Sequence, residues 1–87
     1  MSIELLDALE ASSKKKEPVA LARVIRSPEP AQVGAQALLW LDRPLQGALG
    51  LGNLEPQVLA DAVQALVEGR HRLLRYPEQG VEVFVEV

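Results

Sequence analysis

The feature that most constrains the fold is a single amphipathic helix that follows a glycine-rich turn. Its apolar positions recur with helical spacing and are Val58, Leu59, Ala62, Val63, Leu66 and Val67. Pro56 suits the first helical position, where its missing N–H would be unpaired anyway, and Gly69 suits the residue after the last turn. The spacing therefore predicts a helix over residues 56–68 that buries its apolar side in the core.

Short apolar segments on both sides of this helix predict β-strands. They are residues 19–25, 36–42, 45–49, 71–77 and 81–87. The second and third are close enough to form a hairpin, and the prolines between residues 27 and 34 predict a loop. The last strand alternates strictly, so it should turn Val81, Val83, Val85 and Val87 to the core and Glu82, Phe84 and Glu86 outward.

The first 17 residues predict a short amphipathic helix. Ile3, Leu5, Leu6 and Leu9 fall on one side, and Ser2 suits the N-cap. Three lysines at 14–16 suit the C-terminal end, as a solvated helix end or as an anionic-ligand patch. The predicted fold is α/β of the α+β type, in which a small mixed sheet carries one long helix and a short N-terminal helix. Residues 1–17 form that helix and a linker, and residues 18–87 form the domain.

Composition excludes several classes of protein. The chain has no cysteine, which removes disulfides, zinc–cysteine sites and thiol catalysis. A net charge of −3 and an isoelectric point near 5.0 argue against a nucleic-acid module. No apolar run approaches the roughly 18 residues of a membrane span, and the N-terminus lacks the pattern of a signal peptide. A cytoplasmic protein is therefore expected.

The glycine-rich turn before the helix is the candidate binding site. Gly50, Gly52 and Asn53 tolerate left-handed backbone angles, and the free N–H groups of a helix start favour an anion or an oxygen atom. The Rossmann pattern would need a third glycine where Glu55 stands, and a carboxylate repels phosphate. Glu55 precedes Pro56 and is therefore expected to cap the helix. A ligand site and a tight packing turn both fit this pattern.

Catalytic and metal-binding patterns are weak. His71 is the only histidine, and it is interpreted as a solvated residue at the start of a strand. No serine lies in a G-x-S-x-G motif, so no nucleophile–base pair is predicted. Arg23 either extends its charge to water from a buried strand or points at a ligand. The sequence therefore predicts neither an enzyme nor a metal site.

Residues 18–87 resemble the N-terminal domain of the XdhC/CoxI family. The matching residues are Ser27-Pro28, Gly34-Ala35, Gly47, Gly52 and Glu55, followed by the helix and the strand VEVFVEV. The resemblance implies an accessory protein for the maturation of molybdenum hydroxylases such as xanthine dehydrogenase. It also implies a binding site for the molybdenum cofactor at the glycine turn, on Gly50, Gly52, Asn53 and Glu55.

The sequence departs from the family pattern at several polar positions. Asn53 stands where the family has cysteine, Leu51 where it has glycine and Gly50 where it has serine. Glu29 and Gln32 stand where relatives carry arginines. The resemblance thus implies a stand-alone, non-catalytic accessory protein that holds a partner or transiently the molybdenum cofactor, without covalent attachment. The alternative is a small-molecule-binding module for an unrelated ligand at the Gly50–Glu55 turn.

Two kinds of protein partner follow from these expectations. One is a molybdenum hydroxylase subunit or another maturation factor, as the resemblance implies. The other is a second copy of this chain, because Phe84 on an outward strand face invites a covering subunit. A homodimer is therefore expected, whereas nucleic acid and membrane are not expected as partners.

Overall fold

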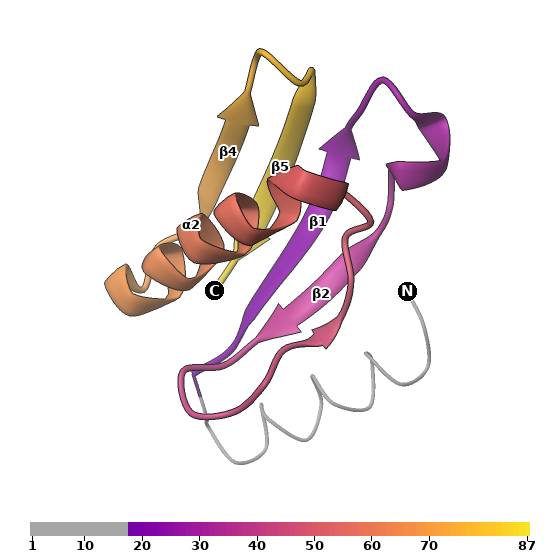
Figure 1. Ribbon diagram of the computed structural model, residues 1–87. Helices are drawn as coiled ribbons and strands as arrows, with labels where there is room; N and C mark the ends of the chain where they lie inside the picture. Colours follow the sequence, from indigo (N-terminus) through magenta and orange to yellow (C-terminus); the bar gives the residue numbers. More distant parts are fainter. Residues whose placement is uncertain (1–17) are drawn as a thin grey trace.

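The structure, a computed structural model, describes residues 18–87 (Figure 1). Along the chain lie β1 (Ala20–Arg26), the 3-10 turn η1 (Pro30–Gln32), β2 (Gln36–Leu39) and β3 (Gln46–Gly47). They are followed by the 3-10 turn η2 (Gly52–Leu54), the helix α2 (Glu55–Glu68), β4 (Arg72–Tyr76) and β5 (Val81–Glu86). The predicted N-terminal helix lies outside the described residues.

The strands form one five-stranded sheet in the order β3-β2-β1-β5-β4. All four neighbouring pairs are antiparallel, including the predicted β2–β3 hairpin. The predicted α+β class is confirmed, whereas the strand directions differ from the mixed sheet that was expected. The reason is the path of the chain after β3. The helix α2 carries the chain from β3 at one edge of the sheet to β4 at the other edge, and the β4–β5 hairpin then places β5 antiparallel to β1.

The core lies between α2 and the face of the sheet that α2 crosses (Figure 1). The helix contributes the buried residues Val58, Ala62, Ala65 and Leu66, and β5 contributes Val81, Val83 and Val85. Leu49 and Leu51 join them from the connection between β3 and the helix. On the opposite face, Leu21, Leu38 and Trp40 form a second buried cluster.

Most predicted elements are confirmed, with corrections at their ends. Gly69 ends α2 in the left-handed region with φ 68°, and its N–H donates to the carbonyl of Leu66 at 3.1 Å. Val67, predicted in the buried stripe, is 61% exposed, and Ala65 is buried in its place. Val87 is 40% exposed because β5 ends one residue earlier.

Candidate functional site

Three loops meet at one end of the sheet. They are residues 27–35 after β1, residues 50–54 before α2 and residues 77–80 between β4 and β5. The Nε2 atom of Gln32 donates a hydrogen bond to the carbonyl of Gly50 at 2.8 Å, which joins the first two loops. A Cβ atom added at Gly80 would lie 3.5 Å from Pro28, so the third loop is adjacent to the first. The sequence-predicted site residues Gly50, Gly52 and Asn53 lie in the middle loop, and Glu55 follows it as the first residue of α2.

The loop after β1 is held by its own polar side chains. The Ser27 hydroxyl donates to Gln32 Oε1 and accepts a hydrogen bond from the N–H of Glu29 at 3.1 Å. Gly34 N–H donates to the carbonyl of Val24 at 2.8 Å. Gln32 therefore connects this loop to the glycine turn, a role that sequence reasoning missed. The only signal was that a neutral amide stands where relatives carry arginine.

The glycine turn adopts the backbone angles that the sequence predicts for its glycines. Gly50 has φ 70° and Gly52 has φ 59°, both in the left-handed region. Asn53 instead lies inside the 3-10 turn η2. Both Gly52 and Asn53 are exposed, so the start of α2 faces solvent.

Glu55 is not the helix cap that the sequence predicts. It is the first residue of α2, with φ −57° and ψ −45°, and Leu54 precedes it without a side-chain capping bond. The prediction is wrong because η2 runs directly into α2, and the N–H of Glu55 already donates to the carbonyl of Gly52. These helical contacts outweigh the usual bias against α geometry before proline.

The Glu55 carboxylate closes the turn on itself. Its Oε1 atom accepts a hydrogen bond from the N–H of Leu51 at 2.9 Å. A negative charge in the first turn also interacts favourably with the helix dipole. The same charge repels a phosphate, so the four predicted site residues do not suit a phosphate-bearing ligand. Gly52 and Asn53 are exposed residues at the helix start, and their N–H groups suit a neutral oxygen atom better.

Substituting Glu55 by Gln should lower the free energy of unfolding by roughly 0.5–1 kcal/mol, because it weakens the contact with Leu51 and removes a favourable charge. Urea denaturation of both proteins measures this difference. Glu78→Gln is the matched control, since it changes the net charge equally in an exposed turn. Equal stability of the two variants would show that the Glu55 contact contributes nothing.

A partly buried hydrogen bond joins α2 to β4. The Tyr76 hydroxyl donates to Asp61 Oδ2 at 2.6 Å. Burial raises the pKa of Tyr76 well above its usual value, and the hydrogen bond to Asp61 and the charge of Asp61 raise it further. Sequence reasoning assigned Asp61 to the outer face of the helix and gave Tyr76 no partner. The pair fixes the distance between the helix and this strand.

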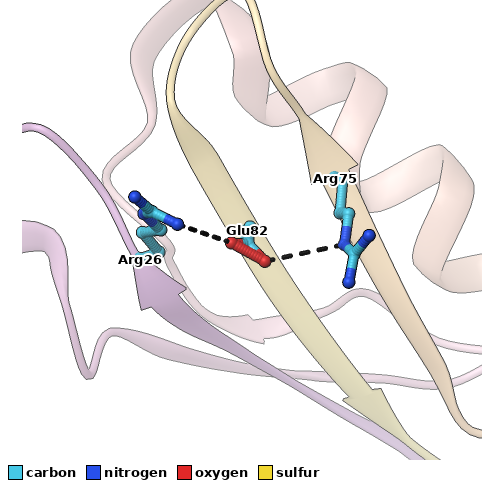
Figure 2. A network of polar contacts seen from close by, with 3 residues as sticks. All are labelled: Arg26, Arg75 and Glu82. Carbon is cyan, nitrogen blue, oxygen red and sulfur yellow. Dashed lines mark ion pairs between the residues drawn. The ribbon is translucent and has the colours of Figure 1, made fainter.

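A row of charges crosses three strands near the β4–β5 turn (Figure 2). Glu82 on β5 lies 3.6 Å from Arg26 on β1 and 3.7 Å from Arg75 on β4. All three line a depression of about 450 Å³ beside the turn. The arginine side chains are 76% and 70% exposed, so these ion pairs contribute little to stability.

His71 is exposed, as its interpretation as a strand-start residue requires, but it also makes specific contacts. Its Nδ1 atom accepts a hydrogen bond from the N–H of Val87 at 3.1 Å, and its ring stacks on Phe84 with centroids 6.5 Å apart. Within residues 18–87, no group of three His, Cys, Asp or Glu side chains is placed to hold a metal ion. In the same range, no helix has the length and apolar character of a membrane span.

Comparison with known proteins assigns the family. The sequence matches the model of the XdhC and CoxI family over residues 12–77, which is more than half of the 87-residue chain. No curated protein matches the sequence significantly. The matched family is associated with accessory roles in the maturation of molybdenum hydroxylases. From the extent of this match, the chain belongs to the XdhC and CoxI family.

Proposed function

We propose that this chain is a non-catalytic accessory protein that assists the maturation of a molybdenum hydroxylase by holding a protein partner. The family match supports the accessory role. The observation that favours a protein partner over the cofactor is the closed glycine turn. There Gln32 donates a hydrogen bond to the carbonyl of Gly50, and Glu55 accepts one from the N–H of Leu51. A turn whose polar groups already bond to one another offers a cofactor few hydrogen-bond donors and acceptors.

Direct contact with the molybdenum cofactor is a narrower form of the same proposal. Gly50, Gly52, Asn53 and Glu55 would be the contact residues. Because that cofactor carries a phosphate, the Glu55 carboxylate opposes it, and the neutral part of the pterin would have to meet the N–H groups of Gly52 and Asn53. The alternative small-molecule module would need a neutral ligand for the same reason.

The partner is proposed to be a molybdenum hydroxylase subunit or another maturation factor. A homodimer is also part of the proposal, through the sheet face that carries Phe84. That side chain is only partly buried and lies opposite Leu73, which is 39% exposed. Two apolar neighbours on an open sheet face favour a covering surface.

The test is affinity purification of the tagged full chain from a host that produces molybdenum hydroxylases. Mass spectrometry should identify a molybdenum hydroxylase subunit or another maturation factor of such an enzyme, retained equally by the wild type and by the Glu55→Gln variant. Pterin analysis of the same samples tests the cofactor form. Stoichiometric pterin on the wild type that falls or rises in Glu55→Gln but is unchanged in Glu78→Gln would contradict the partner-only form; a rise is expected if Glu55 repels the cofactor phosphate. Recovery of a small molecule without any such protein would favour the alternative.

A further inference from the structure

We propose that the edge strand β4 binds an extended, acidic segment of a partner protein by strand addition. This inference specifies how the chain would hold a protein partner, and it rests on the proposed function for the identity of that partner. It concerns the edge of the sheet opposite the β2–β3 hairpin, and nothing in it requires the glycine turn to bind a ligand (Figure 1).

The first observation is that, among residues 18–87, no strand pairs with the outer edge of β4. Strand β4 pairs with β5 over all five of its residues, and the sheet ends there. In an antiparallel pair only alternate residues bond to the neighbouring strand, so the others direct their N–H and C=O groups away from β5. Such an edge is a template for another strand.

The second observation is a groove beside that edge. It has a volume of about 270 Å³ and runs between α2 and β4. Its wall consists of Asp61 and Gln64 from the helix and all five residues of β4. The Tyr76–Asp61 hydrogen bond holds the two elements in place. In strand addition, pockets of this kind accept alternate side chains of the added strand.

The third observation is the charge of the edge. Residues 70–76 contain three arginines and no acidic residue, in a chain whose net charge is −3. Arg72 lies 3.3 Å from Glu68 and Arg75 lies 3.7 Å from Glu82, in ion pairs whose arginines are 47% and 70% exposed. Exposed pairs of this kind are weak, so an incoming carboxylate replaces them at little cost.

The same charges argue against a second copy of this chain at the edge. Pairing β4 with β4 of another molecule would bring arginines opposite arginines, and like charges in facing positions destabilise a pair of strands. Each face of β4 carries an arginine beside an apolar residue: Leu73 and Arg75 on one, Arg72 and Leu74 on the other. The fitting segment is therefore extended, with acidic residues between apolar ones.

The probe is a soluble, fluorescent peptide of about ten residues that alternates valine and glutamate, titrated against the full chain with fluorescence anisotropy as the readout. Arg72→Glu combined with Arg75→Glu should weaken binding at least tenfold. The matched control, Arg23→Glu with Arg43→Glu, makes the same charge change on β1 and in the β2–β3 connection, away from Glu82 and β4, and should shift affinity less than threefold. A valine–lysine peptide should not bind.

Two further measurements keep the proposal falsifiable. Hydrogen exchange should slow at β4 amides when the valine–glutamate peptide is bound, and unchanged exchange there would overturn strand addition. If the double glutamate variant does not fold, Arg72→Gln with Arg75→Gln replaces it and should still weaken binding several-fold. Absence of peptide binding would also overturn the proposal. So would exchange that slows at β4 amides when the chain dimerises without peptide, because a second copy would then occupy the edge. None of these outcomes depends on whether a molybdenum hydroxylase is recovered, so failure of the proposed function is separately visible.

Discussion

Replacing Leu49 by alanine should lower the free energy of unfolding by roughly 2–5 kcal/mol, the range for leucine truncation in a packed core. The Leu49 side chain is 0% exposed and lies in the same cluster as Val58 on α2. It belongs to the connection between β3 and the glycine turn, so it anchors an irregular segment to the helix. A domain of this size has a stability on the order of 5–10 kcal/mol, so the loss would be a large fraction of the total.

Leu45→Ala is the matched control for this prediction. Leu45 lies just before β3, in the connection from β2, and is 41% exposed, so the same truncation removes far fewer contacts. Urea denaturation followed by circular dichroism should show a midpoint close to that of the wild type for Leu45→Ala and a much lower midpoint for Leu49→Ala. Similar midpoints for the two variants would mean that Leu49 is not part of the cooperative core.

The helix and the strands were predictable because the spacing of their apolar residues can be read within each segment alone. The helix Glu55–Glu68 differs from its predicted bounds by one residue, and β5 keeps its valines inward at 81, 83 and 85. Leu49 also fell inside a predicted strand, but that strand comprises only Gln46–Gly47. Its burial follows from packing in the cluster that includes Val58 of α2, which is a tertiary contact that no local period encodes.

The polar contacts of the candidate site were not predictable for a related reason. Gln32 and Gly50 are 18 residues apart, and their hydrogen bond requires the two loops to reach the same end of the sheet. The row Arg26–Glu82–Arg75 depends on β5 lying between β1 and β4, an order that sequence did not give. Left-handed glycines at 50 and 52 were predictable, because that conformation is a property of the residue type.

Glu55 shows where a correct local rule was outweighed. Proline disfavours α geometry in the residue before it, and that rule placed Glu55 outside the helix. The 3-10 turn at Gly52–Leu54 nevertheless delivers the chain in helical geometry, and the Glu55 side chain then reaches back to Leu51. The consequence for function is that the carboxylate serves the fold of the turn and opposes an anionic ligand at the same place.

The formation of a protein persulfide should differ most clearly between the wild type and the variant Asn53→Cys. A protein persulfide forms when a thiolate attacks the sulfane sulfur of a donor persulfide, and the wild type has no cysteine. Mixed with a cysteine desulfurase and cysteine, the wild type should therefore gain no persulfide. An amide such as that of Asn53 makes hydrogen bonds but does not carry sulfane sulfur.

The variant Asn53→Cys should become persulfidated under the same conditions. Residue 53 is exposed and lies in η2, directly before the 14-residue helix α2, whose N-terminal dipole favours a thiolate. The Glu55 carboxylate opposes a thiolate here, but its Oε1 atom accepts a hydrogen bond from the N–H of Leu51, so we expect the helix dipole to outweigh it. Glu78→Cys is the control, because it places an exposed thiol in a turn without a helix start. Intact-mass spectrometry after trapping with iodoacetamide should show faster persulfide formation on Asn53→Cys. Equal rates for the two thiols would mean that this turn does not activate a thiol. Wild-type protein that raises sulfuration of an apo-enzyme without carrying sulfur must act by holding a partner or the cofactor.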